Sequence, residues 1–144
     1  MVNEDSIYLL KECDAGTKMG VASIDDVLEY THSQELKELL SKSKAHHTKL
    51  GDEIHALLLE YGSDEKEASA MAKGMSWMKT SMKMTIDNSN ATVADLITDG
   101  CNMGIKSLYR YMNQYPAANE KVKGLCEKLI EIEDELRRDL RAHL

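Results

Sequence analysis

The sequence has no phenylalanine, one proline and one tryptophan among its 144 residues, and valine is scarce. Aromatic and β-branched residues are the ones that strands favour, so their scarcity argues against a β-sheet protein. Leucine, lysine, glutamate, alanine and methionine are common instead, which predicts an all-α protein. The length is that of one ordinary domain, so we expect residues 1–144 to form a single helical unit.

Membrane and nucleic-acid signals are also missing. No apolar run approaches the roughly 18 residues that a membrane span requires, and the start, MVNEDSIYLL, lacks the basic and apolar regions of a signal peptide. The net charge of −7 disfavours nucleic acid as a partner, because phosphates repel an acidic surface. The three cysteines form no CxxC pair and are odd in number. These features predict a cytoplasmic protein with no membrane or nucleic-acid partner.

Apolar and small residues recur every three or four positions in four long segments, which is the pattern of helices in an antiparallel bundle. The first segment spans about 5–30, and the second begins after a Ser33 cap and stops at Gly62. The fourth helix of the chain begins near a Thr92–Asp95 cap, and the fifth runs from about 118 to the end. The stripe of the second helix consists of Leu36, Leu40, Ser43, His47, Leu50, Ile54, Leu57 and Tyr61. That of the fifth consists of Val122, Cys126, Leu129, Glu133, Leu136, Leu140 and His143.

The chain contains an internal repeat. The stretch GTKMG at 16–20 nearly recurs as GCNMG at 100–104, an offset of 84 residues. The sequences of the second and fifth helices align with an offset of 86 residues, so His47 and Glu133 occupy equivalent positions. The repeat predicts two helical hairpins, 4–62 and 91–144, joined by a crossover segment at 63–90.

Two glycines one turn apart are costly in a helix, at roughly 1 kcal/mol each relative to alanine. They flatten one helix face and allow another backbone to approach closely, as is best known from membrane helices. We therefore expect the first and fourth helices to touch along their glycine faces, near a pseudo-twofold axis.

The crossover segment carries a methionine stripe at helical spacing, formed by Met71, Met75, Met78 and Met82. Such a stripe predicts an extra helix between the hairpins, whose apolar face covers the bundle. Methionine also suits two other roles, an interface with a second copy of the chain or a Cu(I) site built from thioethers.

The chain as a whole resembles the ferritin-like four-helix-bundle superfamily, and in particular a bacterial family of ferritin-like bundle proteins whose function is not established. The resemblance rests on LLKECDAGTKMG at 9–20, LLLEYG at 57–62, Trp77 and IEDELRRDL at 132–140. It implies an all-α, ferritin-like four-helix bundle of two pseudo-repeated hairpins with an extra crossover helix.

The superfamily's di-iron site uses one Glu from each of two helices and a Glu-x-x-His pair from each of the other two. This sequence does not contain that pattern. At the central level of the first and fourth helices stand glycines, Thr17 and Cys101, flanked by Asp14 and Asp99. The resemblance therefore implies the fold of the superfamily for this chain, but not its standard metal site.

One polar pair remains at the centre of the predicted core. His47 and Glu133 occupy equivalent positions of the two repeats, and a buried charged or polar group needs a partner. Either they form a hydrogen-bonded pair that sets the register of the bundle, or they belong to a non-standard metal site. The metal would be iron or manganese, with further ligands from His46, Asp14 or Asp99.

Two functions follow from these alternatives. The first is a non-enzymatic scaffold or interaction protein without a cofactor, which acts through its surface or as a homo-oligomer. The second is a metal-binding or oxidoreductase protein of ferritin type. The cysteines lie on or beside apolar stripes, where thiols are poor nucleophiles, so nothing in the sequence favours covalent catalysis.

Overall fold

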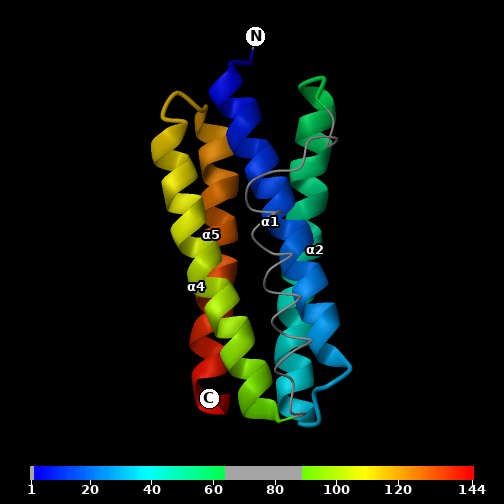
Figure 1. Ribbon diagram of the computed structural model, residues 1–144. Helices are drawn as coiled ribbons and strands as arrows, with labels where there is room; N and C mark the ends of the chain where they lie inside the picture. The colour runs from blue at the N-terminus through cyan, green and yellow to red at the C-terminus, as the bar shows by residue number, and fades with distance from the viewer. Residues whose placement is uncertain (1, 64–88) are drawn as a thin grey trace.

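A computed structural model describes residues 2–63 and 89–144 of the chain. Four long helices run side by side in this part of the chain (Figure 1). They are α1 (Glu4–Leu28), α2 (Gln34–Glu60), α4 (Asn90–Gln114) and α5 (Glu120–Leu140), and a short 3-10 helix, η1 (Arg141–His143), follows α5. The described residues thus form an all-α four-helix bundle. The all-α class agrees with the composition, and the bundle agrees with the spacing of the apolar stripes.

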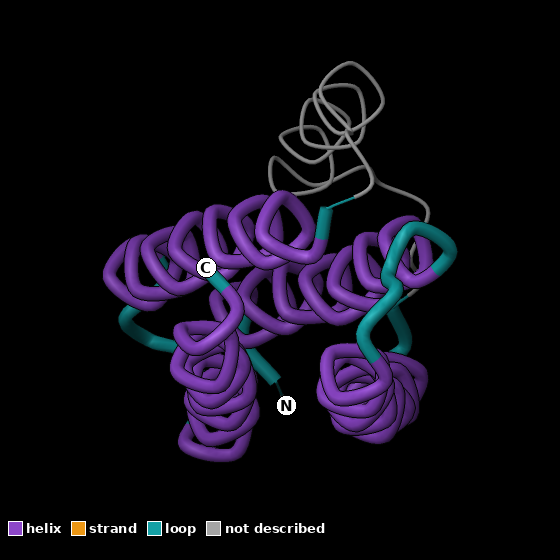
Figure 2. The backbone as a smooth tube through the Cα atoms, turned by 90° about the horizontal axis from the view of Figure 1, so that it is seen from below, coloured by secondary structure: helices purple, strands orange, loops and turns teal. Residues whose placement is uncertain are grey.

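The helices pair as the repeat predicts. The most extensive packing is between α1 and α2 and between α4 and α5, which are the two hairpins. Seen along the bundle, α1 and α4 form one layer and α2 and α5 the other (Figure 2). The hairpins meet through α2 against α5, α1 against α4, and across the bundle through α1 against α5.

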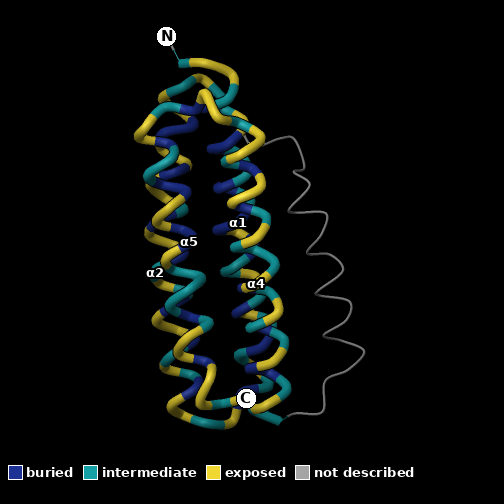
Figure 3. Tube along the Cα trace, turned by 90° about the vertical axis from the view of Figure 1, so that its left-hand side faces the viewer, coloured by how far each residue is buried: buried dark blue, intermediate teal, exposed yellow. Residues whose placement is uncertain are grey.

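The predicted stripes face inward. Every member of the α2 stripe from Leu36 to Leu57 is buried, and so are the apolar members of the α5 stripe from Val122 to Leu140. Buried positions therefore recur along the inner side of each helix (Figure 3). This arrangement follows from the 3.6-residue period, which places residues three and four apart on one face.

The buried apolar residues of 2–63 and 89–144 form two clusters. The first contains Leu9, Leu50, Leu108 and Leu129 with their neighbours, and the second contains Ile24, Leu40, Ile97 and Leu136 with theirs. Between them, each helix contributes a glycine or a polar residue: Gly20 from α1, Ser43 and His47 from α2, Gly104 from α4 and Glu133 from α5. The middle level of the bundle is therefore polar.

Two helix ends agree with the sequence analysis. The Ser33 hydroxyl accepts a hydrogen bond from the Leu36 amide at 3.2 Å and caps α2. At the other end, Gly62 has a φ of 75°, and the Gly62 and Ser63 amides donate to the carbonyls of Leu59 and Leu58. This pattern is the Schellman motif, in which a left-handed glycine ends the helix.

Three other ends differ from the prediction by two or three residues. Helix α1 ends at Leu28 rather than Tyr30, where the Thr31 hydroxyl donates to the Val27 carbonyl. The cap of α4 is Ser89 and not Thr92, because the Ser89 hydroxyl accepts from the Thr92 amide at 3.0 Å. Helix α5 begins at Glu120 with Asn119 as its cap. Near each of these ends, short polar side chains can form hydrogen bonds with the backbone, and the sequence pattern alone does not show which of them ends the helix.

The predicted crossover helix and its methionine stripe fall at 64–88, outside the described residues. Among the helices that the structure describes, none has an apolar stretch long enough to cross a membrane.

The cap of α5 provides a test of the fold. The Asn119 carboxamide oxygen accepts from the Val122 amide at 2.9 Å, and its nitrogen donates to the Tyr61 hydroxyl at 3.1 Å. Because it joins the ends of α2 and α5, we expect Asn119→Ala to lower the free energy of unfolding by about 1–2 kcal/mol in urea denaturation. Asn113→Ala, at an exposed position near the end of α4, should change it by less than about 0.5 kcal/mol. Equal effects would show that Asn119 does not hold the helix ends together.

Candidate functional site

The polar level is organised around one buried side chain, His47. Its imidazole enters the core from α2 and is fully buried. The Nε2 atom lies 2.9 Å from Oε1 of Glu133, which enters from α5. The Nδ1 atom lies 2.8 Å from the carbonyl oxygen of Ser43, one turn earlier on α2. Both ring nitrogens therefore have partners, and the pair joins the two hairpins.

The partners determine where the protons are. A carbonyl oxygen can only accept a hydrogen bond, so Nδ1 carries a proton and donates it to Ser43. The contact between Nε2 and the Glu133 carboxyl then needs a second proton, either on the imidazole or on the carboxyl group. An imidazolium facing a carboxylate satisfies both groups with charge-assisted hydrogen bonds.

The surroundings favour a protonated ring. Burial lowers the pKa of His47, but the hydrogen bond and negative charge of Glu133, with the Ser43 carbonyl, outweigh burial and raise the pKa above its ordinary value. The Glu133 side chain is 12% exposed, so this ion pair is screened much less than a pair at the surface.

The recurring glycines make room for this pair. A Cβ atom on Gly20 would lie 2.6 Å from His47 Nε2, so the imidazole rests directly on the bare α1 backbone. On the other hairpin, a Cβ atom on Gly104 would lie 3.8 Å from the Glu133 carboxyl carbon. Each glycine thus faces the polar side chain of its own hairpin, which is the same relation in both repeats.

This geometry corrects one expectation. Helices α1 and α4 do pack together, but Gly20 and Gly104 do not serve to bring their backbones into contact. The space in front of these two glycines is taken by the His47 and Glu133 side chains. The physical reason is that the His47 ring needs the volume that a methyl group on Gly20 would occupy, while the Glu133 carboxyl group lies in ordinary contact distance of the Gly104 Cβ position.

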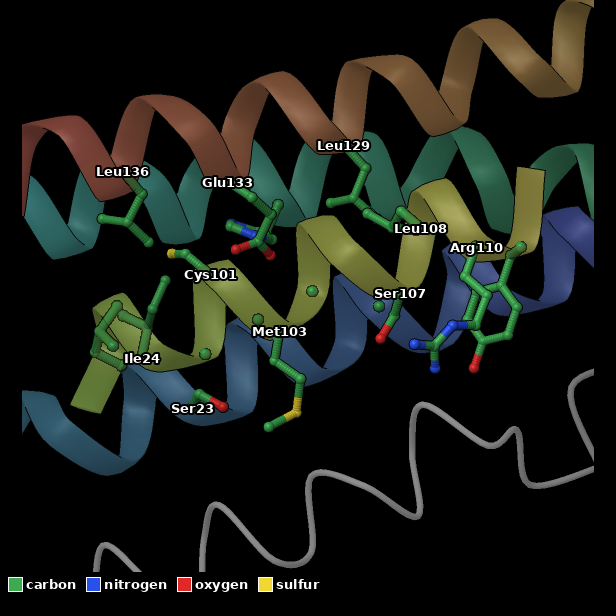
Figure 4. Close-up of a pocket in the computed structure, with 17 residues that line it drawn as sticks. Ser23, Ile24, Cys101, Met103, Ser107, Leu108, Arg110, Leu129, Glu133 and Leu136 are labelled. Atoms are coloured by element: carbon green, nitrogen blue, oxygen red, sulfur yellow. The ribbon is translucent and has the colours of Figure 1, made fainter. Parts of the chain in front are cut away.

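A cavity of about 220 Å³ lies between α1 and α4 over the pair (Figure 4). Glycines of both helices line its walls, and His47 and Glu133 lie at its floor. The lining residues of α1 are Gly16, Gly20, Ser23 and Ile24, and those of α4 are Ile97, Gly100, Cys101, Met103, Gly104, Ser107, Leu108, Arg110 and Tyr111. Leu129 and Leu136 of α5 flank Glu133. Sequence analysis did not predict this cavity, although the paired glycines were its signal.

The surroundings of Cys101 and Cys13 favour neutral thiols. Burial of Cys101, together with the charge and hydrogen bonding of the nearby Glu133, raises the pKa of its thiol. Hydrogen bonding with Cys126 and burial raise the pKa of Cys13. A thiolate is the reactive form of cysteine, so neither environment prepares a nucleophile.

The other predicted ligands lie apart from the pair. His46 borders a separate depression between α2 and α5, with Glu135 and Asp139. Asp14 is buried, pairs with Lys18 at 3.0 Å and faces a groove between α1 and α2 that His47 also borders. Asp99 is exposed on α4. Within 2–63 and 89–144, no three His, Cys, Asp or Glu side chains are grouped so that they could hold a metal ion.

Comparisons with known proteins identify a shared fold. No family model matches the sequence, and no curated protein matches it either. The structure is similar to the crystal structure of a DUF305 fragment from Deinococcus radiodurans, with a TM-score of 0.75 and 9% sequence identity. The match covers 98% of this chain and 95% of that chain. At this identity the likeness concerns the helical fold and not the chemistry of the site.

The raised pKa of His47 predicts how stability depends on pH. A group whose pKa is higher in the folded state stabilises the fold below its unfolded pKa, about 6.5, and this contribution disappears as the pH rises through the folded pKa. We expect the stability difference between the wild type and Glu133→Gln, measured in urea at pH 5.5–9, to be largest at the acid end. Glu131→Gln, an exposed change on the same helix, should show no such trend. A His47 pKa at or below 6.5, measured by NMR, would contradict the ion pair.

The glycines predict opposite effects of one substitution at two positions. Gly20→Ala places a methyl group against the His47 ring and should lower the free energy of unfolding by about 1–3 kcal/mol. Gly124→Ala on α5 meets no atom within 4 Å and should raise it by about 0.5–1 kcal/mol, because alanine favours the helix. Chemical denaturation of both variants checks the prediction, and similar shifts in one direction would show that the ring does not need Gly20.

Proposed function

We propose that the protein is a non-enzymatic, cytoplasmic bundle of ferritin-like type that works by binding, as a scaffold or interaction protein, rather than by metal-centred chemistry. The observation that supports this most strongly is the closed pairing of His47 with Glu133 and Ser43. At the level where a ferritin-like protein holds its metals, this chain places an ion pair whose charges compensate each other.

The remaining side chains of the centre support the same conclusion. A di-iron site needs carboxylates from four helices, but α1 and α4 contribute Gly20 and Gly104 beside the pair. The donor set at this level does not fit the di-iron group of the superfamily. The thiols of Cys13 and Cys101 have raised pKa values and offer no activated nucleophile.

Binding would then use the outer surface, including self-association into a homo-oligomer. Large apolar side chains are exposed at Tyr8, Leu59, Tyr109 and Leu144. Single exposed apolar residues are ordinary in a folded protein, so the proposed interaction role rests on the paired polar centre and not on these four side chains.

A metal-binding function is the second candidate, and one observation favours it. Histidines that bind metals usually donate their other ring N–H to a carbonyl or carboxylate. His47 already donates Nδ1–H to Ser43, and a metal would replace the bond between Nε2 and Glu133. Among the described residues, His46, Asp14 and Asp99 do not form a ligand cluster with the pair. Iron or manganese held by His47 and Glu133 would therefore take its further ligands from water or from other residues.

The metal content of the protein distinguishes the two functions. We expect protein purified without a histidine tag, then incubated anaerobically with Fe(II) or Mn(II), to contain less than a stoichiometric amount by mass spectrometry. His47→Ala and Glu133→Ala should each destabilise the fold by about 1–3 kcal/mol or more, because each leaves a buried group without its partner.

His46→Ala is the matched control, since His46 is the neighbouring residue and is only half-buried. Stoichiometric iron or manganese that is lost in His47→Ala and Glu133→Ala and kept in His46→Ala would establish the metal-binding alternative.

A further inference from the structure

The cavity over the His47–Glu133 pair has two glycine-lined walls. Gly16 and Gly20 belong to α1, and Gly100 and Gly104 belong to α4. Without Cβ atoms, these helix faces are flat, so the space between them is best filled by a flat molecule. Apolar side chains, among them Ile24 and Leu129, form much of the remaining surface.

The volume limits the size of the occupant. An engineered apolar cavity of about 150 Å³ binds benzene, and this cavity is larger, at about 220 Å³. A fused two-ring molecule is therefore a better match than a single ring. Sites of this kind usually combine an apolar lining with a small number of polar groups that orient the ligand.

The polar group at the floor is the Glu133 carboxylate. Its Oε1 atom bonds to His47, and both carboxylate oxygens lie 3.9–4.0 Å from the Cβ position of Gly104, at the cavity wall. The neighbouring Cys101 thiol is a weak hydrogen-bond donor. An N–H or O–H group of a ligand would be a stronger donor to this carboxylate.

The charges at the floor of the cavity also limit which ligands fit. Because the His47 imidazolium already compensates Glu133, a cationic ligand would bury a charge without a counter-charge at this floor. Arg110 also lines the cavity, but an anion placed at the floor would face the Glu133 carboxylate. An uncharged donor avoids both penalties.

We propose that this cavity is a binding site for a small, planar, uncharged and mostly apolar molecule that carries one N–H or O–H donor directed at Glu133. This goes beyond the scaffold function proposed above, and it holds whether or not the chain binds a partner through its surface.

The first test uses the full chain and two probes of nearly the same shape. Indole carries an N–H donor, and indene does not. We expect indole to bind and to shift the NMR signals of the methyl groups of Ile97 and Met103, which line the cavity. Indene should bind about tenfold more weakly, because it leaves the carboxylate without the added hydrogen bond. No binding of indole, equal binding of both probes, or shifts confined to other methyl groups would overturn the proposal.

The second test narrows the cavity. A methyl group in Gly104→Ala would be in ordinary contact with the Glu133 carboxyl group, 3.8–4.0 Å away, so we expect the variant to fold. It should weaken indole binding at least tenfold, because the methyl group stands between the cavity and the carboxylate. Gly124→Ala, outside the cavity, should bind indole as the wild type does.

Circular dichroism establishes that both variants are folded before binding is measured. If folded Gly104→Ala bound indole as well as Gly124→Ala does, the site would not be the glycine-walled cavity. Should Gly104→Ala fail to fold, the comparison of indole with indene on the wild type decides the question alone.

Discussion

The centre of this bundle is organised around a buried contact between an imidazole and a carboxylate. His47 of α2 and Glu133 of α5 meet at 2.9 Å in the middle of the core, where an unpaired charge would be severely destabilising. The pair lies between the two clusters of the apolar core, and its imidazole requires the bare backbone of Gly20, where a Cβ atom would lie 2.6 Å from Nε2.

The internal repeat makes this arrangement possible. Equivalent positions of the two hairpins carry a histidine and a glutamate, so their symmetric approach brings together opposite charges rather than like ones. Each faces a glycine of its own hairpin. The two halves of the repeat thus have the same geometry at the polar centre but different side chains. Gly20 and Gly104 also line the cavity beside the pair.

Much of this architecture was predictable because it is local. Stripes with a period of 3.6 residues indicated which face of each helix is buried, and Leu36 and Val122 illustrate that the prediction was correct. Gly62 and Ser33 marked helix ends by conformational preferences that act within one turn. The ends that were predicted wrongly, near Tyr30 and Thr92, are places where several short polar residues compete for one cap.

The sequence by itself determined the helices, their inward faces, the repeat and the candidate pair, because each depends on residues within a few turns or on a comparison of the two halves. The tertiary structure decided that His47 and Glu133 bond to each other. It also decided that, among the described residues, His46, Asp14 and Asp99 form no ligand cluster with them, and that Gly20 and Gly104 face side chains. These outcomes depend on how four helices rotate and approach one another. A rotation of a helix by one residue turns a side chain by about 100°, which decides whether it meets a partner, a cavity or solvent.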